Sequence, residues 1–119
     1  MEVRLGYVNV FVADFERAVA FYRDTLGLPL RFADAEHGYA SFGTRGASFS
    51  LAREGGDAVA GRFTGVGLVV DDLDAVYADW KAKGVRFTMA PTRQPWGGTL
   101  ALFEDSEGNV LYLDPGSHG

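Results

Sequence analysis

The chain has 119 residues, no cysteine, 47% hydrophobic residues and a formal net charge of −5. This length suits one domain with a real hydrophobic core, and the lack of cysteine excludes disulfides, thiolate catalysis and cysteine-ligated metal centres. The acidic balance is the opposite of the basic surface that binds nucleic acid or anionic membranes, so we expect neither as a partner. No signal peptide and no membrane-spanning stretch stand out, which indicates a cytoplasmic protein.

The first half of the chain predicts a strand, a helix and then three strands. An apolar, β-branched run that starts at Tyr7 ends at Asp14, whose carboxylate is suited to cap the first helical turn. Apolar residues at helical spacing follow, and Gly27 supplies the left-handed stop. These apolar residues are Phe15, Val19, Tyr22 and Leu26. Three strand-like runs separated by glycine or polar turns come next, at residues 30–33, 39–42 and 47–52.

The second half repeats this plan after a glycine- and alanine-rich linker at residues 55–61. Residues 65–73 align with residues 7–15 without a gap, so that Asp72 takes the place of Asp14. The second helix is expected to end at Gly84, and three strands should follow at residues 85–89, 99–103 and 110–113. Each half therefore reads β-α-β-β-β, with module one at about residues 1–54 and module two at about residues 62–115.

Short motifs in both halves carry a family resemblance. Phe21-Tyr22 and Leu26-Gly27-Leu28 close the first helix, and Gln94-Pro-Trp-Gly97 precedes Phe103-Glu-Asp-Ser-Glu-Gly-Asn109. With the repeated module, these motifs make nearly the whole chain resemble the vicinal oxygen chelate superfamily, which includes glyoxalases, extradiol dioxygenases and bleomycin resistance proteins, although Ser106 stands where proline is common. The resemblance implies a single α+β domain over residues 1–119 and a homodimer. In that domain, two tandem β-α-β-β-β modules would form an open, cup-shaped mixed sheet around a cavity, with the helices outside.

Strand alternation predicts which side chains face that cavity. The first strand has one wholly aliphatic face, formed by Val8, Val10 and Val12, and this face should pack against the helices. The opposite face carries polar residues in module one and glycines in module two, which form a poor core but a suitable cavity wall. The residues predicted to bind a ligand are Tyr7, Asn9, Ser48, Ser50, Gly65, Gly67, Trp96 and Tyr112.

The resemblance also raises the question of a metal. Enzymes of the superfamily hold a divalent ion with histidine, glutamate or glutamine side chains at four strand positions, and the resemblance places these positions at Tyr7, Ser50, Gly65 and Tyr112. None of these residues offers an imidazole or a carboxylate, so we expect neither a metal nor another cofactor. A second possible ligand pair, Glu36 and His37, lies on a polar turn where adjacent side chains are expected to point apart.

The aromatic residues allow two interpretations each. Trp96, between a proline and Gly97, either stacks on a planar ligand or caps the sheet. Tyr7 and Tyr112 either line the cavity or pack together and fill it.

The leading hypothesis for function is a small-molecule binding protein that works without a metal. It would resemble the bleomycin resistance branch and sequester an antibiotic or another planar or cationic compound, which aromatic rings and an acidic protein both attract. The alternative is a metal-free lyase, isomerase or hydrolase acting on a small polar substrate, with Tyr7 or Tyr112 as acid or base. A partner-binding domain with a closed cup is a third possibility, so the sequence leaves open whether any reaction is catalysed.

Overall fold

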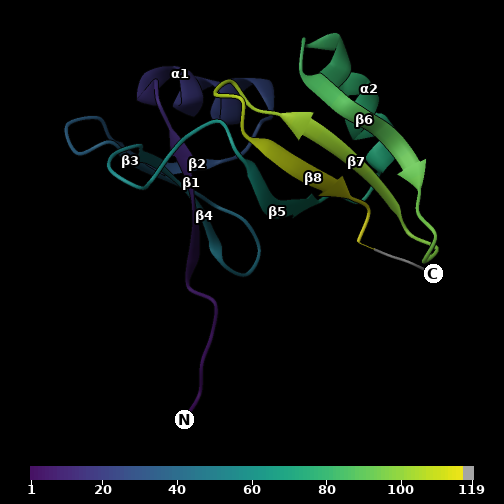
Figure 1. Cartoon of the computed structure of the whole chain (residues 1–119), viewed down its shortest axis with the longest axis horizontal. Coiled ribbons are helices and arrows are strands. Elements are labelled where there is room, and N and C mark those ends of the chain that lie inside the picture. Colours follow the sequence, from purple (N-terminus) through teal and green to yellow (C-terminus); the bar gives the residue numbers. More distant parts are fainter. Residues whose placement is uncertain (117–119) are drawn as a thin grey trace. The chain divides into compact units, whose positions relative to one another are not determined.

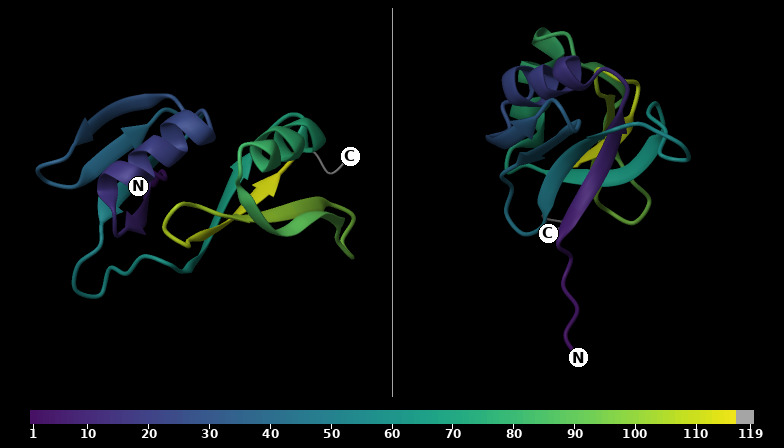
Figure 2. Two further views of the ribbon diagram at one scale, coloured as in Figure 1. Left: turned by 90° about the horizontal axis from the view of Figure 1, so that it is seen from above. Right: turned by 90° about the vertical axis from the view of Figure 1, so that its left-hand side faces the viewer.

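A computed structural model describes residues 1–116 of the chain. It contains two compact units, Met1–Gly61 and a second that begins at Arg62. Each unit has a four-stranded mixed sheet with helical structure over one face (Figure 1, Figure 2). The predicted β-α-β-β-β order is confirmed in both units, and the fold class is α+β. Within residues 1–116, no helix is long and apolar enough to cross a membrane.

Unit 1 places its strands in the order β1-β4-β3-β2. Its elements are β1 (Tyr7–Val12), α1 (Phe15–Ala20), the π-helix η1 (Phe21–Thr25), β2 (Leu30–Asp34), β3 (Tyr39–Phe42) and β4 (Ser48–Arg53). Strand β1 pairs with β4 in parallel, and the other pairs are antiparallel. Two strands far apart in the sequence, β1 and β4, are therefore direct neighbours.

The helix of unit 1 begins where the sequence predicts. Asp14 accepts a hydrogen bond from the backbone N–H of Arg17 at 3.1 Å, which satisfies one of the free amides of the first turn. The predicted apolar stripe packs on the sheet, with the Tyr22 ring 5.1 Å from that of Phe49. The structure differs from a plain α-helix at η1, where the N–H of Leu26 donates to the carbonyl of Phe21. Apolar residues four apart fit an α turn and a π turn equally, so spacing alone does not predict this change.

Unit 2 repeats the arrangement with the strand order β5-β8-β7-β6. Its elements are β5 (Phe63–Val69), α2 (Leu73–Ala82), β6 (Arg86–Arg93), β7 (Thr99–Glu104) and β8 (Val110–Asp114). Asp72 caps α2 by accepting from the N–H of Ala75 at 3.0 Å, and Trp80 packs on the sheet with its ring 5.2 Å from that of Phe103. Strand β6 runs beyond its predicted end at Met89, because an edge strand with two bulges tolerates Pro91.

Candidate functional site

The sheet of unit 1 has two chemically different faces. The face toward α1 and η1 is apolar and buried, and includes Val10, Val12, Phe42, Phe49 and Leu51. We call the opposite side the distal face. It carries Tyr7 and Asn9 of β1 beside Ser48 and Ser50 of β4, in the register Tyr7↔Ser48 and Asn9↔Ser50. The parallel pairing thus brings four of the predicted ligand-binding residues together on one surface.

A polar row crosses the middle of this distal face. Asn9, Ser50 and Ser41 are register partners on three adjacent strands, β1, β4 and β3. Ser50 is 0% exposed and Ser41 is 7% exposed, while Asn9 is half-buried. Within the described part of the chain, the Oδ1 atom of Asn9 and the Oγ atom of Ser50 are buried without a hydrogen-bond partner. Sequence alternation predicts the face of these residues but not their burial, which depends on the pairing of distant strands.

Aromatic side chains flank the polar row. On one side, Phe11 and Tyr39 lie in the next row, on either side of Ala52. The ring of Phe32 lies 5.9 Å from that of Tyr39, and Phe32 is 51% exposed. On the other side Tyr7 is 61% exposed. The distal face of unit 1 therefore combines a polar centre with rings that retain accessible surface.

The distal face of unit 2, which is the side of its sheet opposite the buried Leu111 and Leu113, is built differently. Gly67 pairs with Tyr112, and the Tyr112 ring meets the ring of Phe63 edge-on at 5.3 Å. A Cβ atom at Gly67 would meet only the Cβ of Tyr112 within 4 Å, at 3.7 Å, so space remains above the glycine. Gly65 has a φ of +73°, which L side chains rarely adopt. Gly67 thus leaves room beside Tyr112, whereas Gly65 allows the backbone a positive φ.

Trp96 lies in the turn between β6 and β7. The N–H of Gln94 donates to the carbonyl of Gly98 at 2.7 Å, and Gly97 has a φ of +100°. The indole is 59% exposed, so most of its surface is accessible.

The four positions at which the superfamily places metal ligands do not fit a divalent ion. Tyr7 and Ser50 offer hydroxyl groups on unit 1, and the Ser50 oxygen is sealed from solvent. On unit 2, Gly65 has no side chain and Tyr112 again offers a hydroxyl group. Stable sites for zinc, iron or nickel use imidazole, thiolate or carboxylate ligands, and none of these groups is present at these positions.

The turn between β2 and β3 gathers potential metal ligands that sequence reasoning did not bring together. One ligand atom each of Asp34, Glu36 and His37 lies within 4.8 Å of the others. The expectation that Glu36 and His37 point apart is therefore wrong, and Asp34, at the end of β2, joins them as a third potential ligand. The side-chain hydrogen bond between His37 Nδ1 and Asp34 Oδ2, 2.8 Å long, holds the pKa of Asp34 below its ordinary value. Exposed turns form such contacts without a metal, so this cluster alone does not establish a site.

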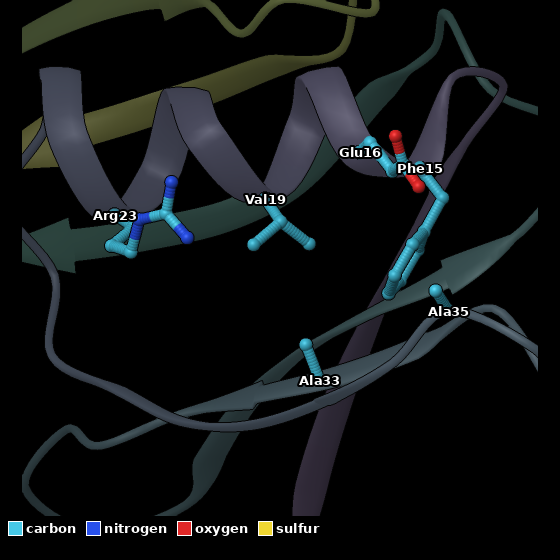
Figure 3. A pocket seen from close by; sticks show the side chains of 6 residues that line it. All are labelled: Phe15, Glu16, Val19, Arg23, Ala33 and Ala35. Atoms are coloured by element: carbon cyan, nitrogen blue, oxygen red, sulfur yellow. The ribbon is translucent and has the colours of Figure 1, made fainter.

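A cavity lies on the other side of the unit 1 sheet, between the helix and β2 (Figure 3). Phe15, Val19 and Ala33 form apolar walls, and Glu16 and Arg23 add charge from the helix. Its volume is about 230 Å³, below the roughly 300–1,000 Å³ of most ligand pockets. Arg23 is already bound to Asp24 at 2.8 Å. None of the predicted ligand-binding residues lines this cavity.

Comparison with known proteins connects this geometry to a family. Residues 4–113 match the model of the Glyoxalase/Bleomycin resistance protein/Dioxygenase superfamily. A bleomycin resistance protein of Klebsiella pneumoniae is 35% identical over 112 residues, which cover 88% of this chain and 86% of that protein.

Solved structures of similar proteins share the fold along almost the whole chain. A member of the same superfamily from Sphaerobacter thermophilus superposes with a TM-score of 0.83 at 28% identity, covering 96% of this chain and 98% of that one. TnmS3, described as an antibiotic binding protein from Streptomyces sp. CB03234, superposes with a TM-score of 0.78 at 32% identity and covers 95% of each chain.

Proposed function

Because this chain belongs to the glyoxalase/bleomycin resistance protein/dioxygenase superfamily, we propose that it binds and sequesters a small molecule without a metal ion and without changing that molecule. The observation that carries the proposal is the distal face of unit 1. There a polar row of Asn9, Ser50 and Ser41 lies between aromatic side chains. Two of its three strands, β1 and β4, are those on which the superfamily's enzymes would present metal ligands. The same strands therefore provide surface for binding and lack the groups for metal-assisted chemistry.

The composition of this surface indicates the class of ligand. Tyr7 and Phe32 are both more than half exposed and offer ring faces on which a planar molecule can stack. On unit 2, Trp96 is also more than half exposed and offers a further ring face. A cationic ligand gains further from these rings and from the net charge of −5. An antibiotic with a planar, positively charged part fits this description, and the named functions of the Klebsiella and Streptomyces relatives support it.

We propose that both modules, residues 1–54 and 62–115, contribute to one binding domain and that the protein works as a homodimer in the cytoplasm. On module two, Tyr112 and the space beside Gly67 would offer a ligand-binding surface of their own. The resemblance to a superfamily of mostly dimeric proteins supports the proposed homodimer.

Binding and sequestration are tested together by titration with bleomycin and with ethidium, a planar cation. We expect the ligand to quench tryptophan fluorescence until the signal saturates at a fixed ratio of bound ligand to chain. Treatment with EDTA should not change the affinity. Mass spectrometry of the released compound should return it unmodified. Recovery of a converted compound would favour the metal-free enzyme, and loss of binding with EDTA would contradict metal independence.

A further inference from the structure

The polar row of unit 1 contains two atoms that the fold itself does not use. Asn9 Oδ1 and Ser50 Oγ are both buried, and within residues 1–116 neither has a hydrogen-bond partner. A buried polar atom without a partner lowers stability, because it loses its bonds to water and gains none in return. Such atoms are rare in folded proteins, and each one calls for a physical reason.

These two atoms belong to one place on the sheet. Asn9 and Ser50 are register partners on the parallel strands β1 and β4, and alternation directs both side chains to the distal face. The neighbouring row consists of Phe11, Ala52 and Tyr39, which are apolar or aromatic. An apolar pair at positions 9 and 50 would therefore suit this sheet better than the pair that is present.

We propose that Asn9 and Ser50 form a hydrogen-bonding subsite for an uncharged amide group of the bound molecule. The amide N–H of the ligand donates to Asn9 Oδ1, and the amide carbonyl accepts from the Ser50 hydroxyl. This inference rests on the proposed function and names the group by which the ligand is recognised. The exposed rings of Tyr7 and Phe32 would then hold the planar or cationic remainder of the molecule.

The chemistry of the subsite favours an amide over an ammonium group. Both oxygens are buried, so a ligand reaches them only when the side chains around the polar row move aside, and Asn9, Ser50 and Ser41 together contribute no negative charge. A buried cation without a counter-charge loses its hydration free energy, and neutral hydrogen-bond partners do not compensate for that loss. An uncharged amide can donate to one oxygen acceptor and accept from one hydroxyl group, so its burial costs less. An ester of the same shape keeps the carbonyl but lacks the N–H that Asn9 requires.

A purely structural explanation makes a different prediction. If the Ser50 side chain took another rotamer and donated to Asn9 Oδ1, the two residues would satisfy each other. Ser50→Ala would then leave Asn9 Oδ1 without a hydrogen-bond donor and lower the melting temperature. If both atoms wait for a ligand, the same substitution removes an unpaired hydroxyl group, and the melting temperature of the ligand-free protein stays the same or rises.

The test compares wild type, Ser50→Ala, Asn9→Leu and the control Ser106→Ala. Ser106 donates to Glu107 in the turn before β8 and is distant in sequence from the row. The probes are 1-naphthamide and methyl 1-naphthoate, which share a planar ring system and a carbonyl group but differ in the N–H groups. Binding is followed by backbone amide NMR shifts, and stability by thermal unfolding without ligand.

We expect wild type and Ser106→Ala to bind the amide at least tenfold more tightly than the ester, with shifts at residues 9 and 50. Ser50→Ala and Asn9→Leu should lose this preference, and Ser50→Ala should melt no lower than wild type. Equal binding of both probes by wild type, a preference kept by Ser50→Ala, or a clearly lower melting temperature of Ser50→Ala would each overturn the inference. If bleomycin or ethidium still binds in that case, the proposed function stands; if none of these compounds binds, the proposed function fails as well.

Discussion

Gly67→Leu tests whether the distal face of unit 2 borders space for a ligand. A Cβ atom at position 67 would meet only Tyr112 Cβ, at 3.7 Å, which is an ordinary contact, and Gly67 does not have the positive φ that marks Gly65. Leucine should therefore be accommodated, and replacing a strand glycine should stabilise the fold by about 0.5–1 kcal/mol. The same side chain fills the space beside Tyr112, so the affinity for ethidium should fall at least tenfold, or by about 1.4 kcal/mol.

Gly65→Leu is the matched control on the same strand. It adds an identical side chain where nothing lies within 4 Å, but its φ of +73° should cost about 1–2 kcal/mol. Denaturant unfolding and fluorescence titration of both variants separate backbone strain from the filling of ligand space, since only Gly65→Leu should lose stability. The reasoning is refuted if Gly67→Leu lowers the free energy of unfolding by more than about 1 kcal/mol, the cost of overpacking a core, or if it binds ethidium like wild type.

Three further predictions concern stability, protonation and assembly. Asp72→Ala removes the cap that accepts from Ala75 and should cost about 1 kcal/mol in urea unfolding; no change would mean that water replaces the cap. Asp34 has a lowered pKa, so the stability from its contact with His37 is present above the unfolded pKa of about 3.9 and is lost as pH falls through the lower folded value. NMR titration of the Asp34 carboxyl should show that pKa rising in His37→Ala, and an unchanged curve would contradict the contact. Light scattering should give about twice the chain mass of 12.9 kDa, and a monomer at micromolar concentration would argue against the homodimer.

The sequence predicted the elements of the fold because local chemistry determines most of them. Asp14 and Asp72 are both found as caps, and Gly27 and Gly84 both have positive φ beyond the helices. The extension of β6 past Met89 was missed, because bulges let an edge strand continue through a sequence that does not alternate regularly.

The candidate site was less accessible to sequence reasoning. Alternation correctly separates Val10 and Val12 from the face of Asn9, but it cannot show that Asn9 and Ser50 are partners. That pairing joins the first and last strands of the module, so it depends on contacts between distant parts of the sequence. The lack of hydrogen-bond partners for Asn9 Oδ1 and Ser50 Oγ depends on the same contacts. The proximity of Asp34 to His37 was missed for a related reason, since the geometry of a turn is not set by the order of its residues alone.

The π turn at Phe21–Thr25 bears on the history of the two halves. Gly27 lies thirteen residues after Asp14, whereas Gly84 lies twelve after Asp72, so the two matching segments differ in length by one residue. If the halves descend from one ancestral module, η1 is the place where that single insertion or deletion is absorbed, because a π turn accommodates one more residue than an α turn. The helix still begins at the Asp14 cap and ends before Gly27, and its apolar stripe stays buried along its length. A wide turn therefore allows a helix to change length without moving its ends, and deletion of one residue within this turn should convert it to the plain helix of the second half.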